Sequence, residues 1–193
     1  MALTFSQTLK LLFNMDFHII PECYVDTNLV ETLVPPAKFA YNHQKGCNNV
    51  TKKMTEDRIL KGDFALGIVD EDKIILKYTK EFEVVIDKIQ LKLLKHPHKN
   101  HYLIYVIPGI EKWIINNANE VKINLTDFGL PHDFLELRKH TKLITSNKDV
   151  RFKRLFKEMR NQNTSGVLLL IKWITYLKTH PYNADLDFFK EGY

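Results

Sequence analysis

Acidic residues directly follow two apolar segments of the chain. Glu22 and Asp26 come after the first segment, and Asp70 and Asp72 come after the second. In an extended segment, side chains two residues apart lie on the same side, so Asp70 and Asp72 would face one point. Converging carboxylates repel one another unless a cation lies among them, and Mg²⁺ prefers oxygen ligands. This spacing therefore indicates Mg²⁺-dependent chemistry on a phosphate group.

Two buried strands would position these acids. Residues 17–21 form a short, mainly apolar run, and residues 64–69 are continuously apolar and are followed by Asp70, as in a central strand of a parallel sheet. Ligands of open α/β sheets bind beyond the carboxyl ends of the strands. We therefore expect both acidic groups to lie at one such edge of the sheet.

The remaining patterns predict an α/β domain followed by helices. Shorter strand candidates occur at residues 74–78, 82–86, 91–94 and 101–107, and helical patterns dominate from residue 131 onward. We expect residues 1–125 to form a catalytic α/β domain with a mainly parallel sheet flanked by helices. Residues 126–193 would form a helical extension packed on it.

Composition excludes several classes of protein. The 193 residues carry a formal net charge of +5, which is compatible with a polyanionic partner. The two cysteines form no CxxC pair, so neither a disulfide framework nor a zinc site is indicated. No stretch has the length of a membrane span, and the N-terminus lacks the pattern of a signal peptide. We expect a cytoplasmic protein.

Two motifs resemble those of the Toprim (topoisomerase–primase) family. Glu22-x-x-x-Asp26, followed by apolar helical residues, is similar to the first Toprim motif, and Asp70-Glu71-Asp72 is similar to its second, the DxD motif. The order and separation of the motifs also agree, over roughly residues 15–120. The resemblance is closer to small Toprim-like proteins of bacterial defence loci and overcoming-lysogenization-defect nucleases than to topoisomerases. It implies a Toprim-like (Rossmann-like) fold.

The resemblance also implies an activity. It implies a Mg²⁺-dependent endonuclease, with Mn²⁺ as a substitute, that cleaves DNA or RNA, tRNA included. It further implies a toxic effector of an antiviral or abortive-infection system, with a regulatory defence protein as a candidate partner. By motif position, Glu22 would act as general acid/base or metal ligand, Asp70 and Asp72 would hold the metal, and Asp26 would support them. Glu111, at the next predicted strand end, would add a ligand.

Each of these residues also has a structural interpretation. Asp26 could cap a helix, and the 70–72 segment could be a turn between two strands. Glu111 could complement the N-terminus of a helix. Lys73 could stabilise charge in the transition state, or be a surface lysine beside two acids.

Basic residues suggest where nucleic acid would bind. His43 and Lys45 lie in a polar loop before a predicted helix, whose first N–H groups favour phosphate. A basic amphipathic helix carries four further candidates, Lys153, Arg154, Lys157 and Arg160, although a solvated face is the commoner explanation. The alternative function is a non-catalytic Toprim-like module that binds nucleic acid or protein. A phosphohydrolase or nucleotidyl transferase acting on small nucleotides is a third.

Overall fold

Five strands form one mixed sheet, in the order β1-β2-β5-β4-β3, in the computed structural model, which describes residues 15–71 and 77–190. β1 (Ile19–Pro21), β2 (Ala65–Asp70) and β5 (His101–Val106) run parallel. β4 (Leu91–Lys95) is antiparallel to β5, and β3 (Glu83–Asp87) is antiparallel to β4. The predicted α/β class is confirmed, with a sheet that is mixed and mostly parallel.

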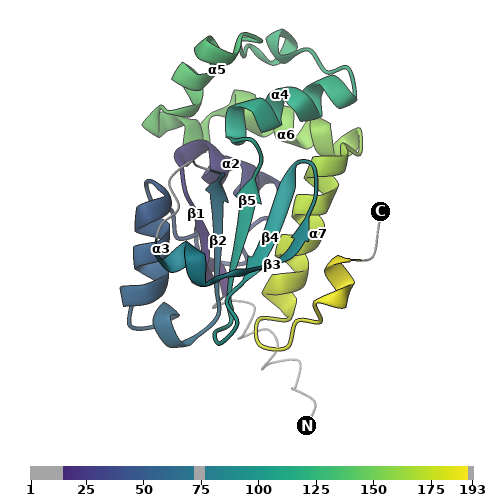
Figure 1. Ribbon diagram of the computed structural model, residues 1–193. Coiled ribbons are helices and arrows are strands. Elements are labelled where there is room, and N and C mark those ends of the chain that lie inside the picture. The colour runs from purple at the N-terminus through teal and green to yellow at the C-terminus, as the bar shows by residue number, and fades with distance from the viewer. Residues whose placement is uncertain (1–14, 72–76, 191–193) are drawn as a thin grey trace.

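Helices cover both faces of the sheet and one of its ends (Figure 1). The helix α2 (Tyr24–Leu33) and the long α7 (Ser165–Thr179) pack on one face, and α3 (Cys47–Glu56) packs on the other. Three further helices lie over the end where the parallel strands finish, namely α4 (Ile110–Glu120), α5 (Phe134–Thr141) and α6 (Val150–Asn161). The site described below lies under this group of helices.

The alternation of side chains along the central strands divides the core into two parts. Leu66 and Ile68 of β2 face the larger cluster, which includes α2, α4, α6 and α7. Ala65 and Val69 face the smaller cluster with Val50 and Met54 of α3. Because both faces of β2 are covered, its residues from 65 to 69 are all buried, which explains its uninterrupted apolar sequence.

The helical extension expected after residue 126 is tied to the α/β part by buried contacts. Lys178 of α7 forms an ion pair with Asp16, with 2.9 Å between Nζ and Oδ1, and also donates to the Tyr41 hydroxyl at 2.9 Å. Asn28 of α2 donates to the backbone oxygens of Ser146 and Asp149. These contacts join segments more than 100 residues apart, so the extension has a defined position on the sheet.

One predicted strand differs from the structure. Of the expected strand at residues 74–78, residues 74–76 lie outside the described part of the chain, and Tyr78–Glu81 is a short 3₁₀ helix. Tyr78 is held there by a hydrogen bond between its hydroxyl and Nδ1 of His101. None of the helices in the described ranges combines the length and the apolar character that crossing a bilayer requires.

Candidate functional site

The carboxyl ends of the three parallel strands lie next to one another. Pro21 at the end of β1 pairs with Ile68 of β2, and Asp70 at the end of β2 pairs with Val106 of β5. The residues that follow each strand therefore meet at one edge of the sheet. This register brings together Glu22, Asp70 and the segment that leads into α4.

Backbone N–H groups hold two of the carboxylates in place. Glu22 Oε2 accepts a hydrogen bond from the Asp70 backbone N–H at 2.9 Å, which links the ends of β1 and β2 directly. Asp70 Oδ1 accepts from the Ile110 N–H at 2.9 Å, at the N-terminus of α4. Gly109, the residue before α4, has φ +124°, a conformation that favours glycine. A Cβ atom at this position would lie 3.8 Å from the Asp70 carboxyl group. The proximity of Glu22 and Asp70 expected from the sequence is present.

Asp26 lies in the first turn of α2, but not at its cap. The helix begins at Tyr24 with Cys23 as the N-cap, three residues before Asp26, so the prediction that Asp26 precedes the helix as its cap is wrong in position. Its Oδ2 instead accepts from the Cys23 backbone N–H at 3.1 Å, as in a capping box. Asp26 is 1% exposed, and its Oδ1 has no hydrogen-bond partner among the described residues. A charged carboxylate oxygen that is buried without a partner is costly, which favours either a proton on Asp26 or a cation near it.

Glu111 lies in the first turn of α4 and joins the same group. Its Oε1 accepts a hydrogen bond from the Thr141 hydroxyl at 2.6 Å, which connects α4 to the end of α5. The positive end of the α4 dipole stabilises the negative charge of Glu111 in the first turn of this helix. It also borders the hollow that contains Glu22 and Asp70.

Burial and mutual repulsion raise the pKa values of the two aspartates. Together with repulsion, loss of solvent, which is the largest cause for both, raises the pKa of Asp70 to about 9 and that of Asp26 to about 7. The repulsion comes from Asp26, Glu22 and Glu111 on Asp70, and from Glu22 and Glu111 on Asp26. The four carboxylates therefore form one electrostatic unit that holds excess protons at neutral pH unless a cation compensates them.

The donor set suits a hard cation, although the side chains do not already enclose one. Among residues 15–71 and 77–190, no three His, Cys, Asp or Glu side chains are arranged to hold one ion as they stand. The candidate metal ligands of the four acids are all oxygens. One of them, the buried Asp26 Oδ1, has no hydrogen-bond partner among the described residues. Mg²⁺ commonly binds one or two carboxylates and keeps several waters, so Glu22, Asp26 and Asp70 fit its usual donor chemistry. Asp72 and Lys73 lie outside the described residues.

Cationic side chains border the same hollow, which has a volume of about 500 Å³. Lys45 comes from the loop before α3, and Arg138 and Lys142 come from the end of α5. None of the three side chains forms an ion pair with a described residue, although carboxylates border the same hollow. Sequence analysis identified Lys45 but missed Arg138 and Lys142. The run of basic residues from 138 to 142 is the only sequence signal for them.

His43 lies behind this hollow rather than on its border. Its ring stacks on Tyr24 with 4.3 Å between ring centroids, and its Nδ1 lies 2.9 Å from the Thr27 hydroxyl. Burial lowers the pKa of His43, so the ring is neutral at pH 7. The arrangement makes His43 a support for Tyr24, which does border the hollow.

The four basic residues predicted on the helix after residue 149 are split between different surroundings. Lys153 and Lys157 of α6 border a second hollow, next to α2. The Arg154 guanidinium lies over the Phe128 ring at 5.7 Å from its centroid, and Arg160 is exposed and borders neither of the two hollows. The predicted basic face is therefore directed at α2 through its two lysines.

Comparisons with protein-family models, curated proteins and solved structures give no match to this chain. The Toprim resemblance thus depends on the residues of the two motifs.

Proposed function

We propose that the protein is a Mg²⁺-dependent nuclease of the Toprim type that hydrolyses nucleic-acid phosphodiesters. The observation that carries this proposal is the acid hollow, bordered by Glu22, Asp70 and Glu111 and coupled to the buried Asp26, opposite cations that form no ion pair with a described residue. Clustered negative charge suits a divalent cation, and the cations suit the phosphate that it would bind. A role in antiviral defence is proposed from the resemblance alone.

In this proposal the side chains provide metal binding, proton transfer and phosphate binding. Glu22, Asp26 and Asp70 would hold Mg²⁺, and Mn²⁺ could substitute for it. When bound, the cation polarises the phosphate and lowers the pKa of a water molecule. Glu22, oriented by the Asp70 N–H, would take a proton from the attacking water. Lys45, Arg138 and Lys142 would bind the non-bridging phosphate oxygens and stabilise the charge that develops there.

The direct test incubates the purified chain with labelled tRNA, single-stranded DNA and duplex DNA, in Mg²⁺, Mn²⁺ or EDTA. We expect cleavage of at least one substrate with either metal and none in EDTA. Glu22→Gln should lower the rate by about 10²–10⁴-fold, as expected for loss of a general base. Asp127→Asn is the matched control, because Asp127 is an exposed carboxylate that borders neither hollow. Cleavage by the Glu22 variant at the wild-type rate would refute the assignment of the site.

A non-catalytic binding module is the second candidate. The observation that favours it is that the described carboxylates do not enclose a metal position as they stand. Such a module would bind nucleic acid equally well in EDTA and after Asp70→Asn, and would cleave none of the three substrates. Binding should then depend on salt alone, with log Kd rising linearly with log salt concentration.

A further inference from the structure

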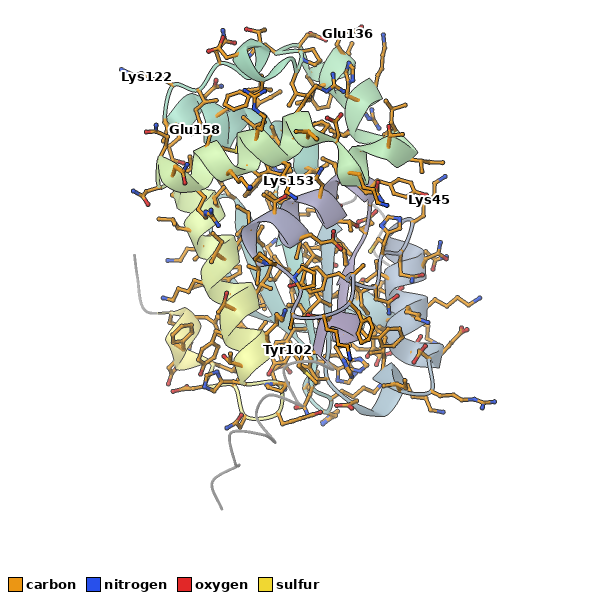
Figure 2. The ribbon with its side chains drawn as sticks, turned by 180° about the vertical axis from the view of Figure 1, so that it is seen from behind. Lys45, Tyr102, Lys122, Glu136, Lys153 and Glu158 are labelled. Carbon is orange, nitrogen blue, oxygen red and sulfur yellow. The ribbon has the colours of Figure 1, made fainter. Side chains whose placement is uncertain are left out.

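A second hollow, the lysine hollow, lies between α2 and α6 and has a volume of about 490 Å³. Three lysines border it, Lys148, Lys153 and Lys157, together with a single acid, Glu31. None of the three lysine side chains forms an ion pair with a residue in the described ranges. In Figure 2, Lys153 and Lys45 lie at a similar height, toward the end of the sheet that α4, α5 and α6 cover. The excess of positive charge here has no partner in the described part of the protein and suits an anionic ligand.

The second hollow adjoins the acid hollow. Tyr24 borders the acid hollow and Asn28 borders the lysine hollow, and the two residues lie one turn apart on α2. The segment from 141 to 148 also borders both, through residues 141–142 in one and residues 147–148 in the other. Asn28 fixes this segment to α2 by donating to the Ser146 oxygen at 2.8 Å and the Asp149 oxygen at 3.0 Å. The two hollows are therefore neighbours along the same rigid helix.

The dimensions and charges favour one class of ligand. Each hollow has the volume of a site for one small molecule. A free nucleotide would fill one hollow and leave the cations that border the other hollow without an anion. Glu22, which borders the acid hollow, is buried, so the scissile group must enter the hollow, which a single backbone can do more readily than a double helix. A positively charged groove of this kind tracks the backbone of single strands.

We infer that the substrate is a single-stranded nucleic acid whose backbone crosses both hollows, with one phosphate in the acid hollow and a neighbouring phosphate bound by Lys148, Lys153 and Lys157. The inference rests on the proposed function, because it takes the acid hollow as the place of the scissile phosphate. DNA and RNA share this backbone chemistry, and the experiment separates them.

Equilibrium binding in EDTA tests the inference without requiring cleavage. Fluorescence anisotropy of labelled 12-residue oligo(dT) and oligo(U) would be compared with that of a 12-base-pair duplex and of a labelled mononucleotide, across a series of salt concentrations. The test variant is Lys153→Gln with Lys157→Gln. The matched control is Lys52→Gln with Lys61→Gln, which removes the same charge from the side of the sheet that carries α3.

At least one single strand should bind more tightly than the duplex and the mononucleotide. The test variant should weaken that binding roughly tenfold at 0.1 M salt and lower the slope of log Kd against log salt by about 1.4, for two lost phosphate contacts. The control should change neither quantity. Equal binding by the test variant and the wild type, or preference for the duplex, would overturn the inference.

The result can be separated from that of the cleavage assay. If the protein cleaves nothing but the test variant alone loses single-strand binding, the strand site stands and the nuclease proposal fails. If the protein cleaves and the test variant binds like the wild type, the nuclease proposal stands and the strand site fails.

Discussion

Neutralising Asp70 should stabilise the metal-free protein at alkaline pH. Burial and three neighbouring carboxylates raise the pKa of Asp70 to about 9 in the folded protein, whereas the unfolded chain ionises an aspartate near pH 4. Between these values the folded state holds a proton that the unfolded state has lost. Stability must therefore fall as pH rises through this window. Asp70→Asn removes that titration, and its amide oxygen can still accept from the Ile110 N–H.

The size of the effect follows from proton linkage. One proton held by the folded state alone changes the free energy of unfolding by about 1.4 kcal/mol per pH unit. From pH 5 to pH 8 this amounts to about 4 kcal/mol for Asp70, and water entering the metal-free hollow would reduce it to about 2 kcal/mol. For a chain of this length, a gain of 2–4 kcal/mol raises Tm by roughly 4–16 °C.

Thermal and urea unfolding in EDTA at pH 5, 6, 7 and 8 would measure the difference between Asp70→Asn and the wild type. The contributions of His43 and His101 are almost equal in both proteins and cancel, so the difference reports Asp70 together with its coupling to Asp26. We expect the difference in the free energy of unfolding between Asp70→Asn and the wild type to grow with pH. Added Mg²⁺ at pH 8 should stabilise the wild type by RT ln(1 + [Mg²⁺]/Kd) and have a much smaller effect on the variant.

Two results would refute this reasoning. The first is a difference in stability that does not change between pH 5 and pH 8, because it would mean that Asp70 is ionised in the folded protein. The second is a variant that is less stable than the wild type at every pH, because Asp70 would then be stabilising as a charged helix cap. Asp127→Asn serves again as the control.

Three further predictions concern the framework that holds the site. Lys178→Met removes one partner of the buried ion pair with Asp16 and should cost about 3 kcal/mol in urea unfolding, whereas Lys190→Met, at an exposed pair, should leave the midpoint unchanged. Gly67→Ala would place a Cβ 2.7 Å from Leu103 Cδ2 and should destabilise the protein by about 1–3 kcal/mol, and an unchanged unfolding midpoint would contradict this close approach. Burial lowers the pKa of His101, so its NMR titration should have a midpoint below 6.5, and its contribution to stability should be lost as pH falls through that midpoint. A midpoint at or above 6.5 would argue against the buried, neutral ring.

The proximity of Glu22 and Asp70 could be predicted from the sequence because it depends on local properties. Each acid follows its strand directly, and the uninterrupted apolar run before Asp70 indicates a strand covered on both faces. Parallel neighbours then bring their carboxyl ends to the same edge. No knowledge of loops or of distant segments is needed for this step.

The start of α2 was harder to place from the pattern alone. Asp26 is a good helix-capping residue, so the sequence favoured a helix beginning after it. The structure begins the helix at Tyr24, with Cys23 in an extended conformation at φ −125°, and Asp26 becomes the third residue of the helix. The interaction between the Asp26 side chain and the Cys23 N–H decides between these neighbouring starts, and propensity differs too little to do so.

Two of the three cations opposite the acids, Arg138 and Lys142, were decided by tertiary structure only. Arg138 and Lys142 reach the hollow because α5 is anchored by the hydrogen bond between Thr141 and Glu111. The lysine hollow exists because Asn28 holds a segment more than 100 residues away against α2. The order of residues along the chain determines which groups follow a strand, whereas contacts between distant segments depend on how whole helices pack. For this reason the sequence alone predicted the acids and Lys45, whereas the packing of α5 brought Arg138 and Lys142 to face them.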